Sequence, residues 1–241
     1  MNSSYLYLLI DISAIAIPLA ASFQKKHNFF KKWKNVWISI FLSGLIFLLW
    51  DGGFTRLGVW GFNPKYLSGI YIGMLPLEEI LFFICIPYAC LFTYFAVTHL
   101  IEKDYLFPHQ ELISSALSII LLISGVFNLE RWYTGITFTG LGFALGLQML
   151  YLRPRYMGRF YLSFLFTLFP FLLVNGILTG FMIPDEVVWY NDEENLGIRI
   201  GTIPFEDVFY GLLLVLSNVI IFEYLEEKDR YKKLLKDEKK S

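Results

Sequence analysis

The sequence predicts an all-α, polytopic membrane protein of about seven transmembrane helices, arranged as two parallel three-helix repeats joined by a linker helix. The composition, the spacing of the apolar segments and an internal repeat support this prediction. Of the 241 residues, 56% are hydrophobic and 17% are charged, and the mean hydropathy is +0.54. These values are too apolar for a soluble domain and are typical of a chain that lies mostly in a bilayer.

Seven apolar runs are long enough to cross a hydrocarbon core roughly 30 Å thick. They cover residues 5–22, 36–50, 70–98, 112–127, 134–152, 160–182 and 203–224. With seven spans, sixteen Lys and Arg residues fall on one side of the membrane and four on the other. Because basic residues favour the cytoplasmic side, we expect a multi-pass protein of the cell membrane with its N-terminus outside and its C-terminus in the cytoplasm.

An internal repeat relates the two halves of the chain. Residues 63–79 align with residues 191–207 at a spacing of 128, and seven of 17 positions are identical. We therefore divide the chain into a first repeat (1–100, spans 1–3), a linker with the fourth span (101–130), a second repeat (131–225, spans 5–7) and a charged cytoplasmic tail (226–241). Three spans reverse the direction in which the chain crosses the membrane, and the single linker span reverses it again. The two repeats should therefore be parallel, related by an axis along the membrane normal.

Each repeat carries a proline followed by two acids at the start of an apolar helix, in residues 76–79 and 204–207. Proline and acids suit the first turn of a helix, so a cap at the headgroup boundary is one interpretation. However, the pattern recurs and an aromatic, apolar run follows each copy, and carboxylates inside a membrane usually serve a site. The candidate catalytic residues are therefore Glu78, Glu79, Glu206 and Asp207.

These residue types suit acid catalysis on an apolar molecule. A buried carboxyl beside other carboxyls can remain protonated near neutral pH and act as a general acid. Aromatic residues, which form 19% of the chain, can stabilise a carbocation with their faces, although each one alone could equally face lipid. Asp11 and Asn175 could line the cavity or form hydrogen bonds between helices. The candidate substrate-binding residues are Trp50, Trp60, Asn63, Phe82, Phe83, Asn191 and Tyr210.

The order Trp50-Asp51, Trp60-Gly61-Phe62-Asn63-Pro64, Leu75-Pro76-Leu77-Glu78-Glu79 and Phe82-Phe83 resembles the lycopene cyclase domain family of the non-flavin type. That family occurs as two small subunits in some bacteria and as fused tandem domains in archaea and fungi. The resemblance covers residues 3–225. The second repeat departs from the pattern, with Tyr190-Asn191-Asp192 in the place of Phe62-Asn63-Pro64 and Asp207 in the place of Glu79.

The resemblance implies a lycopene β-cyclase, an isomerase (intramolecular lyase) that closes the acyclic ends of lycopene into β-rings, giving γ-carotene and then β-carotene. The acid–base reaction exchanges no electrons, so we expect no cofactor and no metal. The glycines at 140–146 lack the spacing of a dinucleotide fingerprint and indicate helix packing instead. The expected partners are the carotenoid substrate, membrane lipids and other enzymes of the carotenoid pathway. The formal net charge of -1 gives no basic face for nucleic acid.

Two alternatives stay open: a cyclase for other carotenoids or for ε-rings, and a small membrane transporter. A retinal protein is excluded because the last span has no lysine for a Schiff base. Parallel repeats should place Glu78 and Glu206 at the same depth. We therefore expect one composite site in which these two act together, with Glu79 and Asp207 as supporting acids or the final base.

Overall fold

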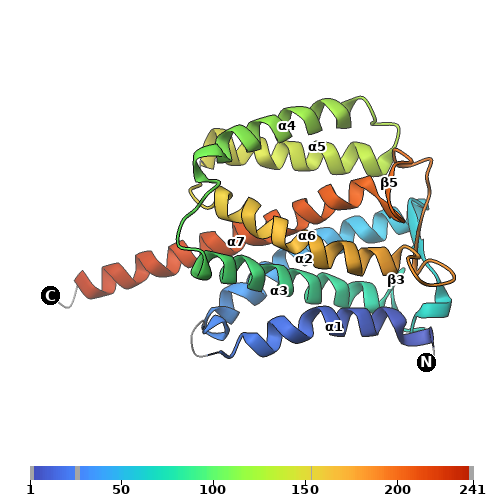
Figure 1. The fold of residues 1–241 in the computed structure, drawn as a ribbon, viewed down its shortest axis with the longest axis horizontal. Helices are drawn as coiled ribbons and strands as arrows, with labels where there is room; N and C mark the ends of the chain where they lie inside the picture. Colours follow the sequence, from blue (N-terminus) through green and yellow to red (C-terminus); the bar gives the residue numbers. More distant parts are fainter. Residues whose placement is uncertain (1–2, 25–27, 153, 239–241) are drawn as a thin grey trace.

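The computed structural model describes residues 3–24, 28–152 and 154–238, which form seven α-helices packed side by side (Figure 1). The helices are α1 (Leu6–Ala21), α2 (Trp33–Leu57), α3 (Leu77–Leu100), α4 (Gln110–Val126), α5 (Trp132–Leu147), α6 (Met157–Leu178) and α7 (Phe205–Glu238). Shorter 3₁₀ segments lie at Ser3–Tyr5, Phe29–Lys32, Pro64–Tyr66 and Phe107–His109, and a π-helical segment lies at Gln148–Leu152.

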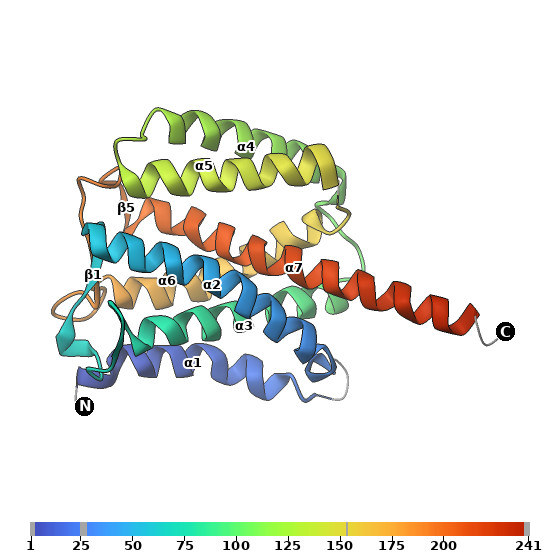
Figure 2. The same cartoon turned by 180° about the vertical axis from the view of Figure 1, so that it is seen from behind.

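The α4–α5 pair forms one edge of the bundle and α1 the opposite edge, with α2, α3, α6 and α7 between them (Figures 1 and 2). Five of the described helices are long and apolar enough to cross a membrane, namely α2, α3, α4, α6 and α7. For α2 and α4 the length includes the preceding 3₁₀ turn, and for α7 it includes the charged end of the helix. Helix α1 is apolar but has only 16 residues. The predicted all-α membrane fold is confirmed.

Two helix boundaries differ from the apolar runs in the sequence. The run at 70–98 becomes a helix only from Leu77, because Gly69 and Gly73 adopt φ values of 85° and 65°, and residues 71–76 form a hairpin. At the other end of the chain, α7 continues to Glu238, so residues 226–238 of the predicted tail are helical. Glu, Lys, Arg and Leu dominate this segment, and all four favour the helical conformation.

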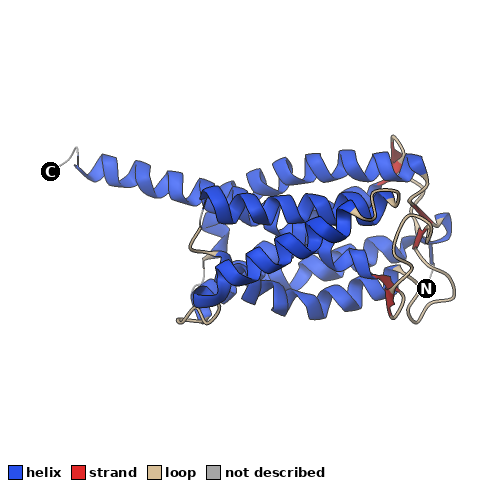
Figure 3. Ribbon diagram, turned by 90° about the horizontal axis from the view of Figure 1, so that it is seen from above, coloured by secondary structure: helices blue, strands red, loops and turns tan. Residues whose placement is uncertain are grey.

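Short antiparallel strand pairs gather at one end of the bundle (Figure 3). Two of them are hairpins, β2 (Tyr71–Ile72) with β3 (Leu75–Pro76) and β5 (Arg199–Ile200) with β6 (Ile203–Pro204). The hairpins match each other at the 128-residue spacing. The Leu77 amide donates to the Ile70 carbonyl and the Phe205 amide to the Ile198 carbonyl, both at 2.9 Å. The aligned segments of the internal repeat thus share one local structure.

A third strand pair joins the two halves of the chain. Strand β1 (Trp60–Phe62) pairs with β4 (Val188–Tyr190), and Gly61 lies opposite Trp189. A Cβ atom at Gly61 would lie 2.3 Å from the Trp189 ring, so a larger residue there would displace this ring. These two strands are themselves related by the 128-residue spacing, so the pair brings equivalent loops of the two halves together.

The glycines of α5 provide close contact with α4. A Cβ atom on Gly142 would lie 2.8 Å from the side chain of Leu122, and the Ser118 hydroxyl donates to the Gly142 carbonyl at 2.7 Å. The prediction that this stretch serves helix packing is confirmed.

The connections that carry most of the basic residues lie at the end of the bundle opposite the hairpins and the N-terminus (Figure 1). Of the basic residues counted for the orientation, Lys25, Lys26, Arg153, Lys239 and Lys240 lie outside the described residues.

Candidate active site

A cavity of about 160 Å³ lies among α3, α6 and α7 and reaches β1 and β4 at the hairpin end. Its lining on α3 extends from Glu79 to Thr93. At 1.5 Å per residue this stretch is about 21 Å long, so the cavity is elongated along the helices. Most of the lining is apolar or aromatic, and the polar groups are concentrated near the hairpin end.

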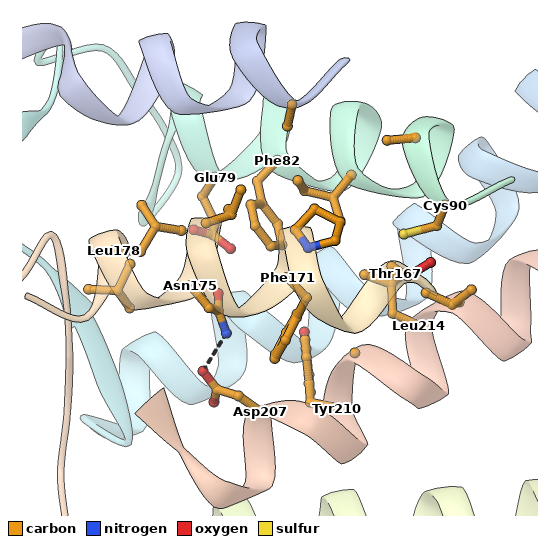
Figure 4. A pocket seen from close by; sticks show the side chains of 18 of the residues that line it. Glu79, Phe82, Cys90, Thr167, Phe171, Asn175, Leu178, Asp207, Tyr210 and Leu214 are labelled. Carbon is orange, nitrogen blue, oxygen red and sulfur yellow. Dashed lines mark hydrogen bonds between the residues drawn. The ribbon is translucent and has the colours of Figure 1, made fainter. Parts of the chain in front are cut away.

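Within the described parts of the chain, three carboxyl groups line this cavity: Glu79, Asp207 and Asp51. Glu79 lies in the first turn of α3 and Asp207 in the first turn of α7. They enter the cavity from different helices (Figure 4). All three are at most 7% exposed. The cavity therefore brings together acids from both halves of the chain.

Each half of the chain supplies a tyrosine hydroxyl to its cavity acid. The Tyr7 hydroxyl of α1 donates to Glu79 Oε2 at 2.6 Å, and the Tyr133 hydroxyl of α5 donates to Asp207 Oδ1 at 2.5 Å. Because α1 and α5 are the first helices of the two predicted repeats, the two tyrosine–acid pairs correspond.

Asp207 accepts two further hydrogen bonds. They come from Asn175 Nδ2 at 2.8 Å (Figure 4) and from the Tyr190 hydroxyl at 3.1 Å. Burial raises the pKa of Tyr190, and the negative charge of Asp207 raises it further, so this hydroxyl remains protonated and able to donate. Asp207 is thus held by three donors from three different elements.

Glu78 and Glu206 are fully buried, but within the described residues they do not line the cavity. Glu78 Oε1 accepts the Ser68 amide at 2.7 Å, and Glu206 Oε1 accepts the Leu196 amide at 2.8 Å. The Thr134 hydroxyl also donates to Glu206, at 2.6 Å. These two acids therefore hold the loops that precede the hairpins.

The prediction that Glu78 and Glu206 converge on one cavity is wrong, because neither is among the described residues that line it. Neighbouring positions on a helix point about 100° apart. When the first acid of each motif faces its own loop, the second faces the centre of the bundle. Glu79 and Asp207, expected as supporting acids, are the two acids of these motifs that reach the cavity.

Three of the seven predicted substrate-binding residues line the cavity: Trp60, Phe82 and Tyr210. The Trp60 ring lies 5.9 Å from the Tyr210 ring, edge to face. Trp50 and Phe83 lie behind this layer, where Trp50 contacts Tyr210 at 5.2 Å and Phe83 contacts Phe82 at 5.7 Å between ring centroids.

Asn63 and Asn191 lie in the loops rather than in the cavity. Each side-chain oxygen accepts the backbone amide two residues later, from Lys65 and Glu193, at 3.1 Å in both cases. This is the Asx-turn geometry that asparagine favours. The two asparagines therefore shape equivalent turns in the two halves.

The sequence did not single out the tyrosines of the site, Tyr7, Tyr133 and Tyr190. A usable signal was the place of Tyr7 near the start of the first apolar run and of Tyr133 directly before the fifth, since both lie in the first turn of their helix. Asn175 realises both alternatives considered for it, since it lines the cavity and bonds between helices. Asp11 is fully buried in α1 and is not among the described residues that line the cavity.

The helical membrane protein thus contains an elongated apolar cavity with tyrosine-bound carboxyls and aromatic rings at one end. A protein of this class can apply acid–base chemistry to a hydrocarbon. The chain belongs to the lycopene cyclase family, whose model matches residues 4–97 and 130–225. Each matched segment contains one copy of the acidic motif. No curated protein and no solved structure matches the chain. Membership of this family supports a role as a carotenoid cyclase.

Proposed function

We propose that the chain is a lycopene β-cyclase that closes the acyclic ends of lycopene by acid–base chemistry within the bilayer. The observation that carries the proposal is the meeting of Glu79 and Asp207, from the two family-matched segments, in one apolar cavity. An apolar cavity elongated by about 21 Å along the helices suits a linear hydrocarbon.

In the proposed reaction Glu79 is the proton donor. Its O–H bond breaks as a C–H bond forms at the terminal double bond, which leaves a tertiary cation. The next double bond attacks this cation and closes the ring, and loss of a ring proton to a carboxylate completes the reaction. Asp207 stabilises the cation as an anion, because its three hydrogen-bond donors favour its carboxylate form. The faces of Trp60 and Tyr210 add to this stabilisation.

The two rings are closed one after the other at this cavity. The acids among the described lining residues lie at the hairpin end, so one end of the substrate meets them while the rest extends along α3 towards Thr93. The one-ring product must leave, turn end over end and bind again before the second closure. A free one-ring intermediate should therefore appear transiently.

The purified protein in lipid vesicles should convert lycopene to β-carotene without added flavin or nicotinamide, because no step transfers electrons. The measurement is pigment separation after incubation, with vesicles that contain the Glu79→Gln variant as the matched control. Conversion that depends strictly on reduced flavin would contradict the acid–base mechanism. Absence of ring closure under either condition would contradict the function itself.

We also propose the orientation that the basic residues favour, with the hairpin end outside and the end of α7 in the cytoplasm. The division into repeats 1–100 and 131–225, with the linker 101–130 and the segment 226–241, is part of this proposal. A reporter fused after Ser241 should be cytoplasmic, and one inserted near Asp192 should not. If both reported the same side, the parallel arrangement of the repeats would be wrong.

A further inference from the structure

Asp51 is a cavity carboxyl to which the proposed mechanism gives no role. It lies in α2, is 2% exposed and lines the cavity. Its Oδ1 accepts the Trp60 Nε1–H at 2.6 Å, whereas its Oδ2 has no hydrogen-bond partner among the described residues. A buried carboxyl oxygen without a partner is costly. Because Asp51 lines the cavity, this oxygen is available to a molecule bound there.

Asp51 and Glu79 line the same cavity, Asp51 from α2 and Glu79 from the first turn of α3. Two carboxylates close together in an apolar cavity repel each other strongly, and such a pair binds its protons as one unit. Asp207 has three donors to stabilise its charge, whereas the pair of Glu79 and Asp51 has one donor for each member. These hydrogen bonds favour the charged form of Asp207 and so favour a proton on the pair of Glu79 and Asp51.

We infer that Asp51 is a third catalytic carboxyl, which shares one proton with Glu79 and takes up the proton that the closing ring loses. This inference rests on the proposed function. Glu79 gives the shared proton to the terminal double bond, which leaves both carboxyls ionised beside the cation. After the new C–C bond forms, Asp51 removes a proton from the adjacent ring carbon and the last double bond forms. The pair then again holds one proton, so the site is ready for the next closure.

This assignment also gives Asp51 control over the ring type. The carbon that loses its proton decides whether a β-ring or an ε-ring forms, so the position of the base is decisive. That position is fixed by Trp60, whose indole donates to Asp51 while its strand β1 is paired with β4. Lengthening the side chain by one methylene keeps the base and moves it.

The test compares Asp51→Asn with Asp51→Glu in lipid vesicles, and scores both the rate of ring closure and the ratio of ring types. Asp51→Asn should lower the rate by about a hundredfold, the lower end of what a general base contributes. Asp51→Glu should close rings faster than Asp51→Asn and shift the ratio of β- to ε-rings. A rate within about threefold of wild type and an unchanged ratio in Asp51→Asn would overturn the inference.

Asp11→Asn is the matched control, because Asp11 lies one helical turn after Tyr7, the donor to Glu79, but is not among the described residues that line the cavity. It should keep the wild-type ratio of ring types and a rate within about threefold of wild type. An equal loss in a folded Asp11→Asn protein would show that negative charge near Glu79 matters and proton transfer to Asp51 does not. If Asp51→Asn does not fold, Asp51→Glu decides, and an unchanged rate and ratio in that variant overturn the inference. If the wild-type protein closes no rings, the proposed function has failed instead.

Discussion

Glu79→Gln abolishes the closure of both rings, with an expected fall in rate by a factor of about 10²–10⁴, the usual contribution of a general acid. Glutamine keeps the shape of the side chain and can still accept the hydrogen bond from Tyr7, but it has no carboxyl proton to donate. Asp207→Asn should also block both closures, because it removes the anion that stabilises the cation. The measurement is the rate of lycopene loss in vesicles with equal amounts of folded protein.

The double variant Glu79→Gln/Asp207→Asn should be no slower than the slower single variant, because the members of one catalytic unit act non-additively. Tyr7→Phe serves as the control, since it removes the hydrogen bond to Glu79 but leaves the acid in place, and its rate should fall far less. If one single variant accumulated a stable one-ring product while the other kept full two-ring activity, the two halves would contain separate sites and the shared cavity would not be the catalytic unit.

The second large effect concerns stability and involves the first acid of each motif. Glu206→Leu leaves the Leu196 amide and the Thr134 hydroxyl without their acceptor, and Glu78→Leu leaves the Ser68 amide without one. Each lost bond to a buried group should lower the free energy of unfolding by about 1–3 kcal/mol. Glu206→Leu should therefore destabilise the protein more than Glu78→Leu does. Thermal unfolding in detergent is the measurement.

Glu79→Gln is the matched control for this comparison, because it changes the neighbouring residue on the same helix turn while keeping its hydrogen bond. It should unfold at nearly the wild-type temperature. If the Glu206→Leu protein unfolded like wild type but closed no rings, Glu206 would act in the reaction rather than in holding the loop.

The helices could be predicted from the sequence because the bilayer imposes a minimum length on every apolar span. The start of α3 was indicated by Pro76 and the two acids that follow it. The hairpin before α3 could not be predicted, since residues 70–76 are nearly as apolar as the helix that follows. The segment after residue 225 was recognised by its charge, but charge alone does not show that α7 continues through it.

The acidic motifs could be found from sequence, but the roles of their members could not. Glu78 and Glu79 are adjacent, so their contacts depend on how α3 is rotated in the bundle, and the rotation is set by helices distant in sequence. The same limit applies to the tyrosines: Tyr7 lies 72 residues before Glu79, and Tyr133 lies 74 residues before Asp207. Asn63 shows the opposite case, because an Asx turn is local and its type of contact could be anticipated.

The most direct test of the proposed function is the pigment time course after the chain is expressed in cells that accumulate lycopene. Lycopene should fall, a one-ring carotenoid should rise and then decline, and a two-ring carotenoid should accumulate, while the Glu79→Gln variant leaves lycopene unchanged. A two-ring product formed equally fast by the Glu79→Gln variant, or lycopene left intact by the folded wild-type protein, would contradict the proposed function.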